Sequence, residues 1–129
     1  MNIAHRKSQL LYVGNEPPLS KASAELLKRV GYRVRTTNPM HVLNALHEGR
    51  YAAVVMCATL TCEEAEAVVC ALTTLAPETP IVSIHLGLLG DAPNPRSSMV
   101  VDALNGPQEL SRAVDAVART QQHAISKAV

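Results

Sequence analysis

The chain has 129 residues, 47% of them hydrophobic, and a formal net charge of +1 from twelve basic and eleven acidic residues. This length predicts a single domain over 1–129 with a core spanning about 9–120 between polar tails. The balanced charge argues against nucleic-acid binding, and no apolar run approaches the ~20 residues of a membrane span. We therefore expect a cytoplasmic protein that binds neither nucleic acid nor membranes.

Apolar runs and amphipathic stretches alternate along the chain. Ser20 is a predicted helix N-cap, Gly31 and Gly49 are predicted helix ends, and Thr61 and Glu64 form a capping-box pattern. In chain order we expect a strand over 9–13, a helix over 20–30, a strand over 32–37, a helix over 39–48, a strand over 51–57, a helix over 61–75, strands over 79–85 and 99–104, and a last helix over 107–120.

The stretch 86–98 interrupts this alternation. Gly87, Gly90, Pro93 and Pro95 fall where a further helix would stand, and they disfavour a regular multi-turn helix. We expect a loop there, with one helical turn near Leu88. Strands and helices that alternate without hairpin turns predict a parallel sheet with helices on both faces.

Four segments of the chain are LLYVGNEP, YAAVVMC, PIVSIH and DALNGPQEL. They resemble, in turn, the first strand and loop, the third strand, the fourth strand, and the fifth strand and Lys-Pro turn of the response-regulator receiver family. The resemblance covers about 9–120. It implies a flavodoxin-like, doubly wound α/β fold of five parallel strands in the order 2-1-3-4-5, and a role in two-component or phosphorelay signal transduction.

The chain departs from this family wherever the family keeps its phosphotransfer chemistry. Each affected position holds another residue: Gly14 and Asn15 replace the acidic pair before the retained Glu16, Cys57 replaces the phosphoacceptor aspartate, His85 replaces a Thr or Ser, Gly106 replaces the lysine, and Ala103 replaces the switch aromatic. The resemblance therefore implies a degenerate receiver, or pseudo-receiver.

The replacements do not suit magnesium or phosphate chemistry. Mg²⁺ takes hard oxygen ligands, whereas Gly14 has no side chain, Asn15 is neutral and Cys57 is a soft thiol. The single carboxylate of Glu16 is not a magnesium site, and Gly106 removes the cation that would balance a phosphoryl group. We expect a protein that is not an enzyme, has no metal or cofactor, and acts through contacts with a histidine kinase, another receiver or an output protein, with a homodimer also open.

Other uses of the same pocket stay open. Cys57 and His85 end adjacent predicted strands, so they could form a thiol- or metal-sensing module with Cys62 nearby. A small ligand could bind the vacated pocket. The resemblance could also record ancestry alone, with both side chains serving only to pack the space.

Overall fold

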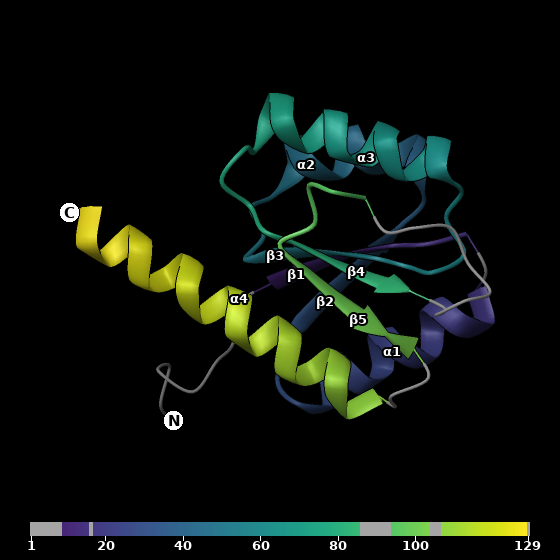
Figure 1. Ribbon diagram of the computed structural model, residues 1–129, viewed down its shortest axis with the longest axis horizontal. Helices are drawn as coiled ribbons and strands as arrows, with labels where there is room; N and C mark the ends of the chain where they lie inside the picture. Colours follow the sequence, from purple (N-terminus) through teal and green to yellow (C-terminus); the bar gives the residue numbers. More distant parts are fainter. Residues whose placement is uncertain (1–8, 16, 86–93, 104–106, 129) are drawn as a thin grey trace.

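The computed structural model describes residues 9–15, 17–85, 94–103 and 107–128 (Figure 1). The elements are β1 (Gln9–Val13), α1 (Pro17–Arg29), β2 (Arg33–Thr37), a short 3₁₀ helix (Pro39–His41), α2 (Val42–Glu48), β3 (Ala53–Met56), α3 (Cys62–Leu75), β4 (Ile81–His85), β5 (Met99–Asp102) and α4 (Pro107–Ala128).

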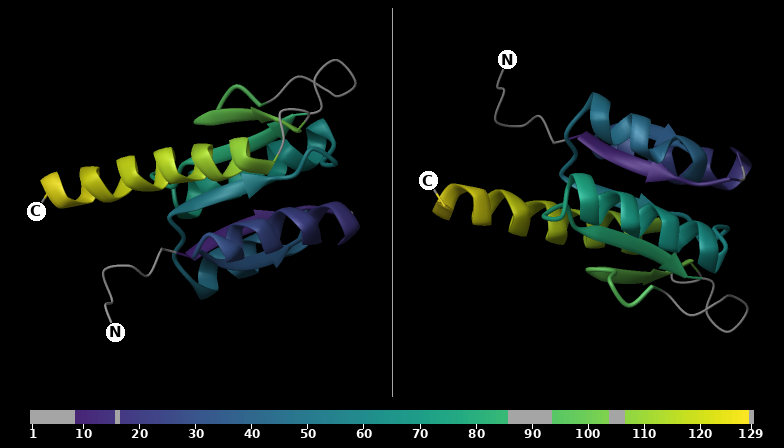
Figure 2. Two further views of the ribbon diagram at one scale, coloured as in Figure 1. Left: turned by 90° about the horizontal axis from the view of Figure 1, so that it is seen from below. Right: turned by 90° about the horizontal axis from the view of Figure 1, so that it is seen from above.

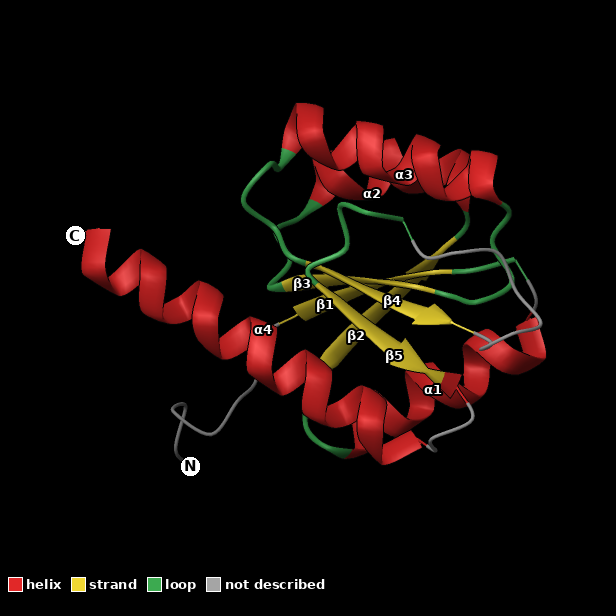
Figure 3. Ribbon diagram, in the orientation of Figure 1, coloured by secondary structure: helices red, strands yellow, loops and turns green. Residues whose placement is uncertain are grey.

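The five strands form one parallel sheet in the order β2-β1-β3-β4-β5, as the resemblance implied. Leu10 lies between Val34 of β2 and Ala53 of β3, so β1 is bonded on both sides. Helices α1 and α4 cover one face, and α2 and α3 cover the other (Figures 1 and 3). The predicted doubly wound fold is therefore confirmed.

Strand alternation gives each helical layer its own core. Leu10 and Tyr12 of β1 pack on the side of α1 and α4, whereas Leu11 and Val13 pack on the side of α2 and α3, and all four are fully buried. Burial of each such side chain contributes about 1.5 to 3 kcal/mol. These strands are apolar on both faces because both faces are covered.

Local signals in the sequence set several element ends. Gly31 adopts a left-handed conformation with φ of 109°, which ends α1. The N–H of Tyr32 then donates a hydrogen bond to the carbonyl oxygen of Leu27. Thr61 and Glu64 form the predicted capping box at the start of α3. Both signals act at the positions where the sequence placed them.

Several boundaries differ from the predictions. α1 begins at Pro17, so Ser20 lies inside the helix and is not its N-cap, because the fixed φ of proline suits the first turn of a helix. β3 and β4 each begin two residues later than expected. β5 ends at Asp102, two residues earlier than expected. α4 continues to Ala128 rather than ending near Thr120, because polar residues without Gly or Pro support a helix past the last core contact. Figure 2 shows this distal half of α4 projecting beyond the edge of the sheet at which the strands begin.

The connection from β4 to β5 agrees with the predicted loop where it is described. Residues 94–98 contain a turn and no helix, and the predicted turn near Leu88 lies outside the described residues. Ser97 is hydrogen-bonded to Ser83, and the N–H of Ser98 donates to the carbonyl oxygen of Ile81 at 2.8 Å. Within the described chain, no helix is long and apolar enough to cross a membrane.

Candidate functional site

The site expected from the sequence lies where β1 and β3 end side by side. In open α/β sheets, ligands bind outside the carboxyl ends of the strands, beside the point where the strand order reverses. Val13 pairs with Met56, and the N–H of Cys57 donates to the carbonyl oxygen of Val13 at 2.9 Å. Gly14, Asn15 and Cys57 therefore follow neighbouring strands at this edge, as the topology predicted.

Asn15 is tied to the helix that follows β3. Its side-chain amide donates to both carboxylate oxygens of Glu64, each at 2.8 Å. We call Gly14, Asn15, Cys57, Thr59 and Glu64 the carboxyl-edge site. The one carboxylate that the described structure brings beside Asn15 thus comes from α3 and is already hydrogen-bonded.

Glu64 has a second structural task. Its carboxylate accepts the N–H of Thr61 at 2.8 Å, and its own N–H donates to the Thr61 hydroxyl at 3.1 Å. The Thr61 N–H and then the Asn15 amide lower the pKa of Glu64, because each donor favours the charged form. Glu64 is held ionised as a helix cap and as the acceptor for Asn15.

Cys57 is a buried group at this edge. Only 6% of the residue is exposed, and it belongs to the core beneath α1 and α4. The hydroxyl of Thr59, in the loop before α3, donates to the Cys57 sulfur at 3.3 Å. The thiol is packed and hydrogen-bonded where the receiver family would present its phosphoacceptor.

A buried hydroxyl that has no hydrogen-bond partner in the described part of the chain lies near Cys57. Tyr12 is fully buried, and its hydroxyl makes no hydrogen bond of normal geometry within the described residues, although the side chains of Ser23 and Cys57 are close to it. Burial raises the pKa of Tyr12 well above its usual value. The interior behind the site therefore disfavours a negative charge.

The structure does not support a direct Cys57–His85 pair. Cys57 packs toward α1 and α4, whereas Ile81, on the same side of β4 as His85, packs toward α2 and α3. Alternation thus directs the two side chains to opposite faces of the sheet. Cys62 is exposed at the start of α3, and no group of three metal-binding side chains forms among the described residues.

The remaining predicted site residues divide into two groups. Glu16 and Gly106 lie outside the described residues. Ala103 is exposed directly after β5, next to Asp102, which pairs with His85 across the strands. At the end of β5, the position predicted to correspond to the switch aromatic thus presents a single exposed methyl group.

The described carboxyl-edge site does not fit a magnesium ion. Gly14 offers only its backbone, the Asn15 amide is already paired with Glu64, and the Cys57 thiol is soft and buried. These groups can maintain one arrangement of the loops but cannot supply several free oxygen ligands.

Sequence analysis missed the roles of Glu64 and Thr59 in this site. The capping-box pattern revealed Glu64, but only as a helix cap. Its contact with Asn15, 49 positions away along the chain, depends on α3 beginning beside the end of β1. Thr59 had no signal beyond lying two residues after Cys57.

Comparison with known proteins supports the fold. No family model and no curated protein sequence matches the chain. Solved structures do match: the receiver domain of a sensor histidine kinase from Pseudomonas aeruginosa, with a magnesium ion coordinated in its active-site cleft, is 18% identical with a TM-score of 0.75, covering 87% of this chain and 98% of that chain.

Two further structures are similar. The response regulator TrrA from Thermotoga maritima, in complex with Mg²⁺ and BeF, is 19% identical with a TM-score of 0.71, covering 84% of this chain and 97% of that one. NtrX from Brucella abortus, in complex with ADP, is 16% identical with a TM-score of 0.78, and the match covers 95% of this chain but 28% of that protein. At these identities the likeness shows that this chain has the fold of CheY-like receiver domains.

Proposed function

We propose that this protein is a receiver-like signalling module of two-component type that works through protein contacts and does not accept a phosphoryl group. The receiver fold supports the signalling role, and the carboxyl-edge site supports the loss of phosphotransfer. The proposal includes a cytoplasmic location, with which the three free cysteines agree because they suit a reducing compartment. It assigns the chain no catalytic activity.

The bond from Asn15 to Glu64 carries this proposal. An acidic residue at position 15 would repel Glu64 across the same distance, whereas the neutral amide donates to both of its oxygens. The loop after β1 and the start of α3 are therefore joined without a metal ion. A receiver that needs no ion to connect these loops can present one constant surface to a partner.

The edge strand β5 offers a place for that partner. β5 is the last strand of the sheet, and Val100 on it is 46% exposed although it is apolar. Ala103 is exposed just beyond. The partner proposed for this surface is a histidine kinase, another receiver or an output protein gated by one.

The absence of phosphotransfer is tested by amide NMR with Mg²⁺ and beryllofluoride, which imitates a bound phosphoryl group. We expect no shift of the Asn15 and Cys57 amides in the natural protein. The matched control is a variant with Gly14→Asp, Asn15→Asp, Cys57→Asp and Gly106→Lys. Its amide signals should shift when the same reagents are added. Saturable shifts at Asn15 and Cys57 of the natural protein would refute the proposal, whatever the control does.

The partner surface is tested by cross-linking in cells followed by mass spectrometry. We expect the protein to capture a two-component protein and to lose it in Val100→Lys. Thr74→Lys, at an exposed position on α3, is the control and should keep the partner. Capture that is equal in both variants would contradict the assignment of the surface to β5.

A further inference from the structure

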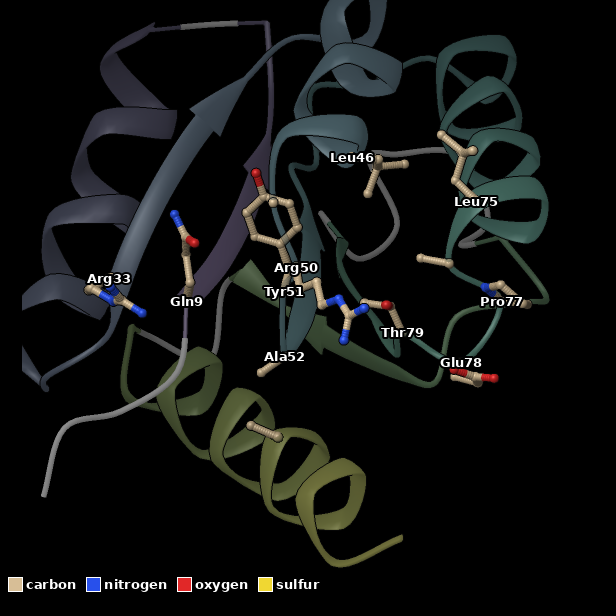
Figure 4. A pocket seen from close by; sticks show the side chains of 13 residues that line it. Gln9, Arg33, Leu46, Arg50, Tyr51, Ala52, Leu75, Pro77, Glu78 and Thr79 are labelled. Atoms are coloured by element: carbon tan, nitrogen blue, oxygen red, sulfur yellow. The ribbon is translucent and has the colours of Figure 1, made fainter. Parts of the chain in front are cut away.

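A groove opens at the opposite edge of the sheet, where the strands begin (Figure 4). Its volume is about 890 Å³, within the range of small-molecule sites. The side chains that matter most for its chemistry are Gln9, Arg33, Leu46, Arg50, Leu75 and Glu78. We call this cavity the amino-edge groove; it shares no residue with the carboxyl-edge site.

Two arginines flank the start of β1 in this groove. Gln9 pairs with Arg33 of β2 on one side, and on the other side its carbonyl oxygen accepts the N–H of Ala52, two residues after Arg50. β2 and β3 therefore lie two strand spacings, roughly 10 Å, apart, with Arg33 at the start of β2 and Arg50 in the segment before β3. Arginine side chains are long enough to converge on one anion across that span.

Neither guanidinium is neutralised within the described structure. Arg35, on the same strand as Arg33, forms an ion pair with Glu48 at 3.1 Å, but no described carboxylate pairs with Arg33 or Arg50. The segments that lead into Gln9 and follow Ala118, residues 1–8 and 119–129, contain no acidic side chain. No described side chain therefore neutralises these two exposed arginines, and both can bind an anion.

The rest of the groove limits what that ligand can be. Leu46 and Leu75 provide an apolar wall, and Leu75 is 38% exposed. The Tyr51 hydroxyl donates to the carbonyl oxygen of Ala45 at 3.0 Å, so it is not free to bind. Glu78 lies across the groove from Arg33 (Figure 4), where it would repel a second anionic group.

We propose that the amino-edge groove binds a phosphate monoester with an uncharged, apolar body. A phosphate monoester carries between one and two negative charges at neutral pH and accepts paired hydrogen bonds from guanidinium groups. Arg33 and Arg50 hold the phosphate, and the Leu46 and Leu75 wall holds the organic body. Molecules with an anion at each end are rejected by Glu78.

Phenyl phosphate is the probe that tests this site, by amide NMR titration of the full chain. We expect saturable shifts at Gln9, Arg33, Arg50 and Thr79, with binding weakened about tenfold in Arg33→Gln and in Arg50→Gln, as expected for loss of one charged hydrogen-bonding group. Arg112→Gln, an exposed change of equal charge on α4, is the control and should bind like the natural protein.

Three outcomes would overturn the proposal. They are no saturable shift at the groove, shifts that persist unchanged in both arginine variants, and inorganic phosphate binding as tightly as phenyl phosphate. Circular dichroism of each variant verifies that it is folded. Because the groove lies at the opposite edge from Asn15 and Cys57, these results leave the proposed signalling function untouched.

Discussion

Polar side chains at the carboxyl edge of the sheet, where the strands end, differ in their bonding from those at the amino edge, where the strands begin. At the carboxyl edge, where this fold class places its ligands, Asn15 is hydrogen-bonded to Glu64. Cys57 is buried there, and its sulfur accepts a hydrogen bond from Thr59. At the amino edge, Arg33 and Arg50 face a groove without an ion-pair partner among the described residues. A fold can therefore close the pocket that its topology provides and leave ligand-binding capacity elsewhere.

The largest effect is expected from placing a charge at the carboxyl edge. Cys57→Asp should lower the free energy of unfolding by about 3 kcal/mol, because its carboxylate would lie beside the buried Tyr12 without a cation. Urea denaturation measures it. Cys57→Ala is the control for lost packing, with an expected loss of about 1 kcal/mol. Equal losses in the two variants would mean that the edge is open to water.

A smaller loss is expected from breaking the link between β1 and α3. Glu64→Ala removes the acceptor for the Thr61 N–H and for the Asn15 amide, while the Thr61 hydroxyl still accepts the backbone N–H of residue 64, and the loss should be about 1 to 2 kcal/mol. Glu63→Ala, its exposed neighbour in the same first turn, should cost a few tenths of a kcal/mol. Chemical denaturation of both variants distinguishes the loss of the Glu64 hydrogen bonds from the loss of a negative charge in the first turn. Similar losses of unfolding free energy in the two variants would contradict the proposed role of Glu64.

The same link should depend on pH in one direction. The pKa of Glu64 is lowered in the folded protein, so its stabilising effect is fully present above the ordinary glutamate value of 4.5 and is lost as the pH falls through the lower folded value. The stability difference between the natural protein and Glu64→Ala should therefore be constant near neutrality and shrink below pH 4.5. A difference that grows in acid would contradict this sign.

Removing the Tyr12 hydroxyl should stabilise the protein. Tyr12→Phe is expected to raise the free energy of unfolding by about 1 kcal/mol, because it removes a buried donor that has no hydrogen-bond partner among the described residues. Tyr51→Phe is the matched control: its hydroxyl donates to Ala45, so its removal should destabilise by about 1 kcal/mol. Thermal unfolding of both variants shows whether each change raises or lowers the free energy of unfolding. A lower value in Tyr12→Phe would reveal a hydrogen-bond partner for the Tyr12 hydroxyl.

The smallest effect is expected at the amino edge. Arg33→Gln should change the free energy of unfolding by less than about 0.5 kcal/mol, because an exposed side chain that bonds to no other described residue contributes little to the folded state. The contrast with Glu64→Ala sharpens the comparison of the two edges. A loss above 1 kcal/mol would assign Arg33 a structural role and argue against a free binding group.

The sequence predicts a feature when the residues that form it lie close together along the chain. The strand order, the stop at Gly31 and the Thr61–Glu64 cap depend on local patterns and on family resemblance, and all were predicted. The Asn15–Glu64 bond joins residues far apart in the chain, so no local pattern contains it. The amino-edge groove likewise forms only when Arg33 and Arg50 are brought to the same edge.

The opposite orientation of Cys57 and His85 depends on how β3 and β4 are aligned, which sequence analysis did not establish. Cys57 directly follows β3 and His85 ends β4, but alternate residues counted back from each lead to Val55 on the face of α1 and α4 and to Ile81 on the face of α2 and α3. The register between the two strands decides this parity, and register follows from packing rather than from composition. Adjacency of strand ends alone was not enough to predict contact.

The most direct test of the closed carboxyl edge is intact mass spectrometry after incubation with acetyl phosphate and Mg²⁺. We predict that the natural protein keeps its mass, since position 57 offers a buried thiol and no carboxylate. The variant with Gly14→Asp, Asn15→Asp, Cys57→Asp and Gly106→Lys runs in parallel. A gain of one phosphoryl group on the natural protein that hydroxylamine removes, as it removes an acyl phosphate, would contradict the account.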